Sequence, residues 1–127
     1  SFALEVLSDQ RYEIGLMEAT LRGWGEPVSD DDGVVMGWMD HELPDVEMPG
    51  LATPDEIDAL SDATTPEEVP SRWLQLMTVH HEGGVHMADA GAARVADADV
   101  RALARRIARN QRIEINEYAA VRTRLGL

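Results

Sequence analysis

The sequence predicts an all-α protein, because its apolar residues recur with helical spacing and no alternation typical of a strand persists. Residues that favour helix starts and helix ends divide the chain into three long helices and one short one. The expected helices span residues 1–23, 54–61, 66–95 and 98–125. Residues 24–52 form a long connection between the first two.

The expected helices have their own boundary signals. Thr53 and Thr65 are each followed by Pro and two acidic residues, a pattern that caps and begins a helix. Asp97 or Asp99 caps the last helix. The two-residue link after Val95 places the last two helices in an antiparallel hairpin.

Two segments are similar enough to indicate an internal duplication. Residues 2–21 align with residues 103–122 without a gap, and both place Gln and Glu three residues apart on the face that should be buried. A buried carboxylate is costly unless it is paired, hydrogen-bonded or bound to a metal. We therefore expect four side chains to approach one another or the histidines of the middle helix: Gln10, Glu13, Gln111 and Glu114.

The buried face of the last helix follows heptad spacing, with alternating steps of four and three residues. Three long helices leave one side of a four-helix arrangement open, so we expect either a symmetric dimer or cover from the short helix. The positions on the buried face are Val100, Ala104, Ile107, Gln111, Glu114, Tyr118, Val121 and Leu125.

The chain has 127 residues, 44% of them hydrophobic, which is enough for one domain with its own core. We divide this domain into the first helix, a Met- and Asp-rich connection over 24–65 with the short helix, and a helical hairpin over 66–127. No apolar run approaches the ~20 residues of a membrane span. Cysteine is absent, which excludes disulfides and thiolate metal ligands.

The net charge of −13 argues against nucleic acid as a partner, because phosphate binding needs clustered basic residues. The charge is uneven: residues 26–70 are rich in Asp and Glu and lack Arg, whereas residues 98–127 are rich in Arg. We interpret the acidic stretch as a solvated loop that lies along the basic last helix. It has no EF-hand spacing for calcium.

The middle helix concentrates histidine. His80 shares a helix face with Met77 and Met87, His81 occupies the adjoining face, and His86 is expected to point outward. For the tandem pair, a metal-binding role and a structural role both remain open. The neighbouring Gly83-Gly84 pair costs a helix about 1–2 kcal/mol relative to Ala, which indicates close packing or room for something beside His80.

The connection carries a second group of soft ligands, Met36, Met39, His41 and Met48. Thioether and imidazole groups suit Cu(I) where Cys is missing. The alternative is that the Met side chains pin a long loop to the bundle.

The stretches MT-x-HH-x-GG-x-x-MA in residues 77–88 and VRALARRI-x-x-x-Q-x-x-EI in residues 100–115 resemble the bacterial domain of unknown function family 305 (DUF305). The resemblance implies a ferritin-like antiparallel helical bundle, an exported protein whose signal segment would precede Ser1, and copper binding as in some relatives. It also implies that residues 1–23 are one helix of a truncated first unit. By this resemblance His80, His81 and Met77 are the first ligands to consider, and Met39, His41 and Met48 the second.

The sequence does not favour an enzyme. A di-iron site of the ferritin type needs Glu-x-x-His, which does not occur, and no nucleophile or phosphate-loop motif is present. We therefore expect an exported copper-binding or copper-buffering protein. The alternatives are a helical interaction module with a buried His/Gln/Glu network and, less favoured, a degenerate metalloenzyme. The candidate metal ligands are His80, His81, Met77, Met87, His86, Gln111, Glu114, Met36, Met39, His41 and Met48.

Overall fold

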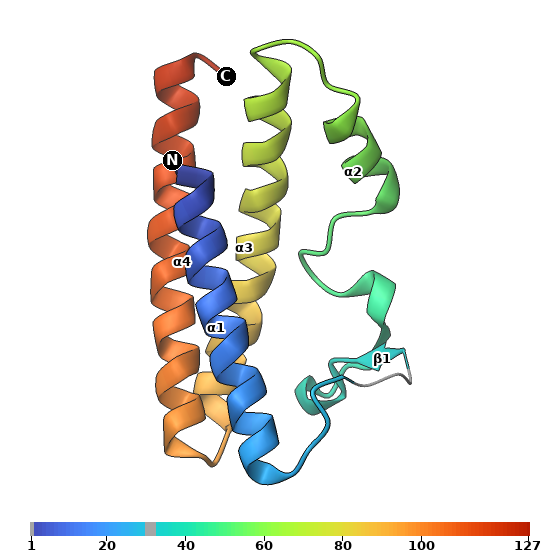
Figure 1. Cartoon of the computed structure of the whole chain (residues 1–127), viewed down its shortest axis with the longest axis vertical. Coiled ribbons are helices and arrows are strands. Elements are labelled where there is room, and N and C mark those ends of the chain that lie inside the picture. Colours follow the sequence, from blue (N-terminus) through green and yellow to red (C-terminus); the bar gives the residue numbers. More distant parts are fainter. Residues whose placement is uncertain (1, 30–32) are drawn as a thin grey trace. The chain divides into compact units, whose positions relative to one another are not determined.

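The computed structural model describes residues 2–29 and 33–127; Ser1 and residues 30–32 of the predicted first helix and connection lie outside the described residues. The all-α prediction is confirmed, with helices α1 (Phe2–Trp24), α2 (Pro54–Ser61), α3 (Glu68–Arg94) and α4 (Ala98–Leu125) (Figure 1). The chain forms two compact units, residues 1–33 and 34–127. Each is described on its own. Within the described residues no helix is both long enough and apolar enough to cross a membrane.

The first unit consists of α1 and its carboxyl-terminal turn. Gly25 has a φ of 78°, and its N–H donates to the carbonyl of Arg22, while the N–H of Glu26 donates to the carbonyl of Leu21. These two bonds form a Schellman motif, which satisfies carbonyls at the helix end and needs a residue that tolerates positive φ. The packing of Gln10 and Glu13 against other helices stays a prediction.

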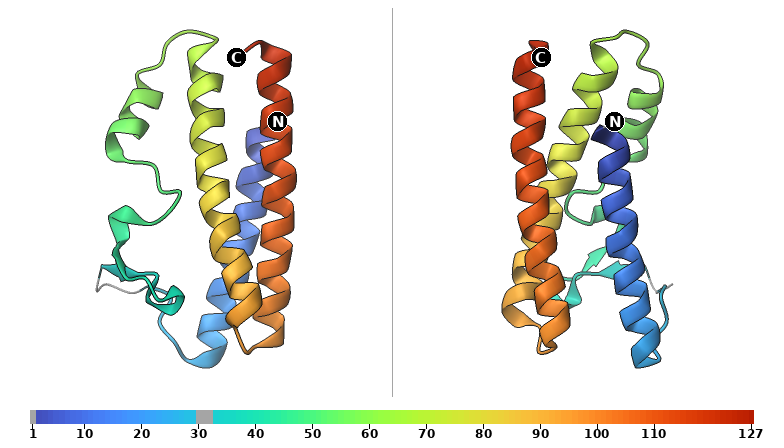
Figure 2. Two further views of the ribbon diagram at one scale, coloured as in Figure 1. Left: turned by 180° about the vertical axis from the view of Figure 1, so that it is seen from behind. Right: turned by 60° about the vertical axis from the view of Figure 1, so that its left-hand side comes forward.

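In the second unit α3 and α4 lie side by side and run in opposite directions, as predicted (Figures 1 and 2). The side chain of Asp97 accepts hydrogen bonds from the N–H groups of Asp99 and Val100 and so caps α4. The guanidinium of Arg101 donates to the carbonyls of Val95 and Ala96 and holds the short link. The turn of the hairpin therefore depends on contacts between residues that are close together in the sequence.

The buried face of α4 matches the predicted heptad positions from Val100 to Val121, none of which is exposed. Leu125 was predicted on this face, but it is 53% exposed. It belongs to the last turn, which ends in a left-handed Gly126 and has no covering element among the described residues of the second unit. The most deeply buried side chains of the hairpin are Leu74, Ala108, Tyr118 and His81.

The part of the connection that belongs to the second unit, residues 34–65, lies along α3, on the side away from α4 (Figures 1 and 2). Helix α2 begins with a complete capping box between Thr53 and Glu56 and packs beside α3. The prediction that the acidic stretch follows the basic α4 is therefore wrong for residues 34–65. Only a short link separates α2 from α3, and the earlier part of the connection binds Arg94 of α3 through Asp40.

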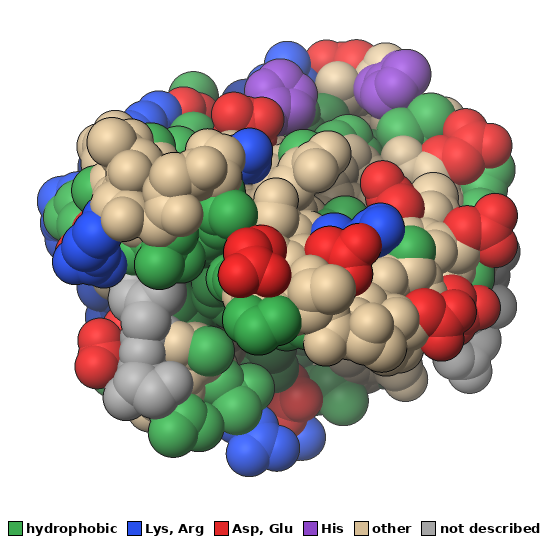
Figure 3. All heavy atoms as spheres, turned by 90° about the horizontal axis from the view of Figure 1, so that it is seen from above, with side chains coloured by type: hydrophobic (Ala, Val, Ile, Leu, Met, Phe, Trp, Pro, Cys, Tyr) green, Lys and Arg blue, Asp and Glu red, His purple; other side chains and the backbone are tan. Residues whose placement is uncertain are grey.

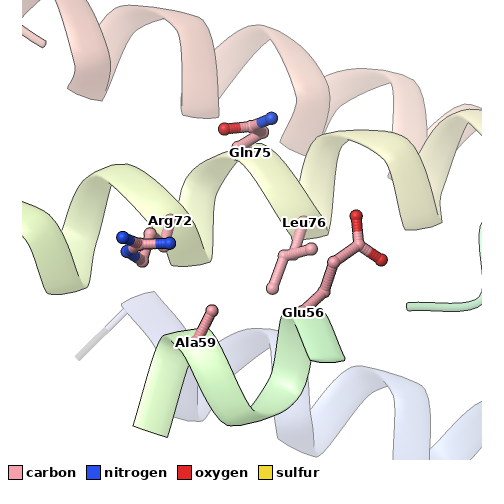
Figure 4. A pocket seen from close by; sticks show the side chains of 5 residues that line it. All are labelled: Glu56, Ala59, Arg72, Gln75 and Leu76. Atoms are coloured by element: carbon pink, nitrogen blue, oxygen red, sulfur yellow. The ribbon is translucent and has the colours of Figure 1, made fainter. Parts of the chain in front are cut away.

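A small pocket lies between α2 and α3 and has a volume of about 100 Å³ (Figure 4). None of the predicted ligands lines it. Its lining residues are Glu56, Ala59, Arg72, Gln75 and Leu76.

The connection also contains a short antiparallel ladder, in which β1 (Val34–Val35) pairs with β2 (Leu43–Pro44). Two residues per strand are too few to produce a detectable alternation in the sequence, and the ladder is compatible with the all-α prediction. Between the strands the chain makes a 3-10 turn at Gly37–Met39, and a second 3-10 turn follows at Asp45–Glu47.

Candidate functional site

The centre of the α3–α4 hairpin is a buried polar network around His81, whose side chain has no exposed surface. Nε2 of His81 contacts the carboxylate of Glu114, and the hydroxyl of Tyr118 lies 3.1 Å from the same nitrogen. Trp73 packs edge-on against Tyr118, with ring centroids 5.7 Å apart. The expectation that Glu114 faces inward and approaches the tandem histidines is confirmed.

The network determines which nitrogen carries the hydrogen in the neutral form of the His81 ring. An ionised carboxylate can only accept, so Nε2 carries the hydrogen and donates it to Glu114. Burial raises the pKa of Tyr118 well above its usual value, and the negative charges of Glu114 and Glu117 and a hydrogen bond to Glu114 add to the effect. The phenol therefore stays protonated at neutral pH and donates to Glu114.

The other ring nitrogen of His81, Nδ1, is buried and has no hydrogen-bond partner among the described residues. In this tautomer Nδ1 presents a lone pair. The amide oxygen Oε1 of Gln111 is likewise buried, with no hydrogen-bond partner in the described part of the chain. A Cβ added to Gly84 would approach this oxygen closer than 3.0 Å. Gly84 thus allows the Gln111 amide to enter the helix interface one turn from His81.

His80 faces the connection and its side chain is exposed. Its Nδ1 lies 3.1 Å from the carbonyl oxygen of Gly50, which can only accept, so Nδ1 carries the hydrogen and Nε2 is left with a lone pair. Nε2 has no hydrogen-bond partner within the described part of the chain. Histidine side chains are visible at the surface in Figure 3, whereas His81 lies inside.

The Gly50 carbonyl is held by a tight turn over residues 48–51. The N–H of Leu51 donates to the carbonyl of Met48 over 3.0 Å, Pro49 is the second residue, and Gly50 has a φ of 86°. Pro followed by a glycine with positive φ is typical of a type II turn. The turn lies directly against α3, because a Cβ on Gly83 would come closer than 3.0 Å to the Pro49 carbonyl. Gly83 therefore makes room for the turn that holds His80.

The remaining candidate metal ligands of α3 surround the tandem histidines His80 and His81. Met77 and Met87 are half-buried and His86 is exposed, as predicted for His86. Met77 precedes His80 by three residues and His81 by four, so its side chain neighbours both on the helix surface. The rings of His80 and His81 have centroids 5.7 Å apart. Met48, also half-buried, belongs to the turn that contacts His80.

The other candidate metal ligands of the connection lie near a different part of α3. The carbonyl of Trp38 and the carboxylate of Asp40 accept hydrogen bonds from Arg94, over 3.3 and 2.9 Å. Met36 is buried, Met39 is half-buried and His41 is exposed in this segment. Since Arg94 is the last residue of α3, this group lies far along the helix from His80 and His81.

Sequence reasoning missed two partners of the tandem histidines. Tyr118 was expected on the buried face of α4 but was given no contact with His81, and the Gly50 carbonyl was not considered at all. The Pro49-Gly50 pair is a recognisable turn signal, but nothing local indicates that the turn reaches α3. No group of three or more His, Asp or Glu side chains is arranged to hold a metal ion in the described ranges 2–29 and 33–127.

The comparisons with known proteins agree on one family. The sequence model of the domain of unknown function DUF305 matches residues 1–122. The crystal structure of a DUF305 protein from Streptomyces coelicolor, described as a candidate secreted protein, is similar with a TM-score of 0.84 and 32% identity, over 98% of this chain and 72% of that one. A DUF305 fragment from Deinococcus radiodurans is similar with a TM-score of 0.77 and 31% identity, over 99% of this chain and 74% of that one. No curated protein matches the sequence. With a family model that covers nearly the whole chain, and with two structural relatives of the same description, the protein belongs to the DUF305 family.

Proposed function

We propose that this protein is an exported, non-catalytic copper-binding protein that stores or buffers copper at the tandem His80-His81 pair. One observation carries the proposal. Each histidine of the pair has one ring nitrogen next to a hydrogen-bond acceptor of the protein, and the other nitrogen has no partner among residues 2–29 and 33–127. Histidines that ligate metals are usually held in this way, by a carboxylate or a carbonyl on the second nitrogen.

His81 has the stronger form of this arrangement. Its Nε2–H is directed at the Glu114 carboxylate, which makes the ring more electron-rich and fixes its orientation. The lone pair on Nδ1 is buried without a partner, and a metal ion would satisfy it. A purely structural histidine would be expected to have both nitrogens hydrogen-bonded, because a buried polar atom without a partner is costly.

His80 and two methionines supply the other ligands of this centre. Nε2 of His80 is accessible, Met77 is its neighbour on the helix, and Met48 precedes the turn that contacts it. Two imidazoles and two thioethers form a soft ligand set, and Cu(I) accepts two to four such ligands without geometric demands. Glu114, a candidate ligand in the sequence, acts here as the acceptor that orients His81 rather than as a ligand. The amide of Gln111, the other candidate of α4, lies beside Gly84.

Export is the second part of the proposal. The Streptomyces relative is described as a candidate secreted protein. The absence of Cys suits an oxidising environment, where thioether ligands are not lost to disulfide formation.

The proposal is tested by titrating the protein with Cu(I) under anaerobic conditions and following its melting temperature. We expect saturable binding and a rise of several degrees, because a ligand selective for the folded state stabilises it. Met77→Leu, which keeps the side-chain volume, should weaken this rise without lowering the melting temperature of the metal-free protein by more than a few degrees. His80→Ala should weaken it further.

His86→Ala is the matched control, since His86 is an exposed histidine of the same helix outside the pair. It should leave the copper-dependent rise unchanged. Equal losses in His80→Ala and His86→Ala would mean that copper binds surface histidines without selection, which would contradict the proposal.

A second candidate function is a helical interaction module without metal. The hydrogen-bonded contacts among His81, Glu114 and Tyr118 favour it, because they also explain why polar residues are buried in the hairpin. In that case copper would not raise the melting temperature, and light scattering would show a stable homodimer or a complex with another protein.

A further inference from the structure

Tyr118 and His81 are the two largest fully buried side chains among residues 2–29 and 33–127. They meet across the interface of α3 and α4, with ring centroids 5.2 Å apart and ring planes inclined at 78°. This is the edge-to-face arrangement that aromatic pairs favour. Trp73 packs edge-on against Tyr118, and His80 packs edge-on against His81. Tyr118 therefore holds the plane of the His81 ring from the side of α4.

The hydroxyl of Tyr118 has two polar neighbours, which differ in what they can accept. It lies 3.1 Å from Nε2 of His81 and forms a hydrogen bond with the Glu114 carboxylate. An ionised carboxylate can only accept, so the phenol donates to Glu114 and its oxygen lone pairs remain available to Nε2. Nε2 then has two oxygen acceptors beside it, the carboxylate and the phenol. A hydrogen on Nε2 suits both of them.

The same contacts disfavour the other placement of the hydrogens. If the phenol donated to Nε2, this nitrogen would present a lone pair to the Glu114 carboxylate. Two acceptors in direct contact, with no donor between them, are costly where no water can enter, and His81 has no exposed surface. The hydroxyl of Tyr118 thus favours the neutral tautomer of His81 whose lone pair is on Nδ1, the nitrogen without a partner in the described part of the chain.

We propose that Tyr118 is a positioning residue of the His80-His81 copper centre: its hydroxyl holds the Glu114 carboxylate against Nε2 of His81, and its ring holds the imidazole plane. Nδ1 is thereby left as the nitrogen of His81 that is available to a metal ion. The inference rests on the proposed function, since it assigns Tyr118 a part in copper binding. The hydroxyl of Tyr118 is used within the network, so Tyr118 is not itself a ligand.

Tyr118→Phe tests this role, because it keeps the ring and removes only the hydroxyl. In the metal-free wild type, nitrogen NMR should show His81 as a single tautomer with its hydrogen on Nε2. In metal-free Tyr118→Phe the same resonances should shift toward a mixture of the two neutral tautomers. Competition with a chromophoric Cu(I) chelator should show an affinity about 10–100-fold weaker, as is usual when a partner that orients a metal-ligating histidine is lost.

Two controls separate this role from general effects on the fold. Tyr12→Phe removes the hydroxyl of the only other tyrosine in the chain, which is 61% exposed, and should change neither the His81 resonances nor the Cu(I) affinity. Val100→Ala removes half-buried packing from α4, 18 residues before Tyr118 and so about 27 Å away along the helix. It should lower the melting temperature and leave the His81 resonances unchanged.

The positioning role requires both changes in Tyr118→Phe, in the tautomer of His81 and in the Cu(I) affinity. A variant that lacks either change, while wild type binds Cu(I), would refute the role and leave the copper centre standing. Absence of Cu(I) binding by wild type would refute the proposed function and this role together. If circular dichroism shows that Tyr118→Phe is unfolded, wild type decides: proton NMR should resolve a Tyr118 hydroxyl that exchanges slowly with water, and a rapidly exchanging hydroxyl would overturn the inference.

Discussion

Replacing Glu114 by Ala is expected to lower the free energy of unfolding by about 2–3 kcal/mol. The substitution removes the acceptor of the His81 Nε2–H and of the Tyr118 hydroxyl, and both donors are then left in a buried site. A buried donor without a partner costs about 1–3 kcal/mol. The His81 side chain has no exposed surface and that of Glu114 is only 14% exposed, so water replaces the carboxylate poorly. Denaturant-induced unfolding, followed by circular dichroism, measures the effect.

Glu117→Ala provides the control, because Glu117 lies on the same helix but is exposed. Its effect should stay within about 0.5 kcal/mol. Glu114→Gln keeps an acceptor of similar size, so its loss in free energy of unfolding should lie between those of Glu114→Ala and Glu117→Ala. If Glu114→Ala and Glu117→Ala destabilise the protein equally, the carboxylate of Glu114 does not form the buried network described above.

Gly83→Ala is expected to release the turn over residues 48–51 from α3. Ala is favoured over Gly in a helix by about 1 kcal/mol, so the substitution would stabilise α3 if space allowed. The added Cβ would, however, meet the backbone carbonyl of Pro49, which cannot move without moving the whole turn. We expect a net destabilisation of about 1–2 kcal/mol. The hydrogen bond between His80 and the Gly50 carbonyl should also be lost, and with it part of the copper affinity.

Gly84→Ala is the matched control for this effect. Its Cβ would meet the amide of Gln111, the far end of a flexible side chain, which can rotate away. We expect Gly84→Ala to be nearly neutral in stability and to keep the His80–Gly50 contact. A Gly83→Ala variant as stable as Gly84→Ala, with unchanged copper binding, would show that the turn does not depend on close approach to α3.

The helices could be predicted from the sequence because their ends are determined locally. The Thr53 and Glu56 side chains form the capping box that α2 needs, and Asp97 caps α4 where the sequence places a cap. The inward position of Glu114 followed from heptad spacing, and the placement of His80 and His81 on adjoining faces of α3, with His86 outward, followed from helical periodicity. These are short-range patterns, and the structure confirms them in the second unit.

The contacts that define the site could not be predicted, because they join residues that are distant in the chain. His80 lies 30 residues from Gly50, and His81 lies 37 residues from Tyr118. The turn over residues 36–41 has left-handed Met36 and Asp40, which propensity does not favour and which Arg94 supports from 54 residues away. Sequence reasoning grouped Met39, His41 and Met48 into one set of ligands. The structure separates them along α3.

The central claim, that copper binds the tandem histidines through their free ring nitrogens, is tested most directly by nitrogen NMR of the histidine side chains. In the metal-free protein His81 should carry its proton on Nε2, since that nitrogen contacts Glu114. On addition of Cu(I), the Nδ1 resonance of His81 and the Nε2 resonance of His80 should shift and saturate together, while those of His86 stay unchanged. Resonances of His80 and His81 that remain unchanged with excess Cu(I) would contradict the claim.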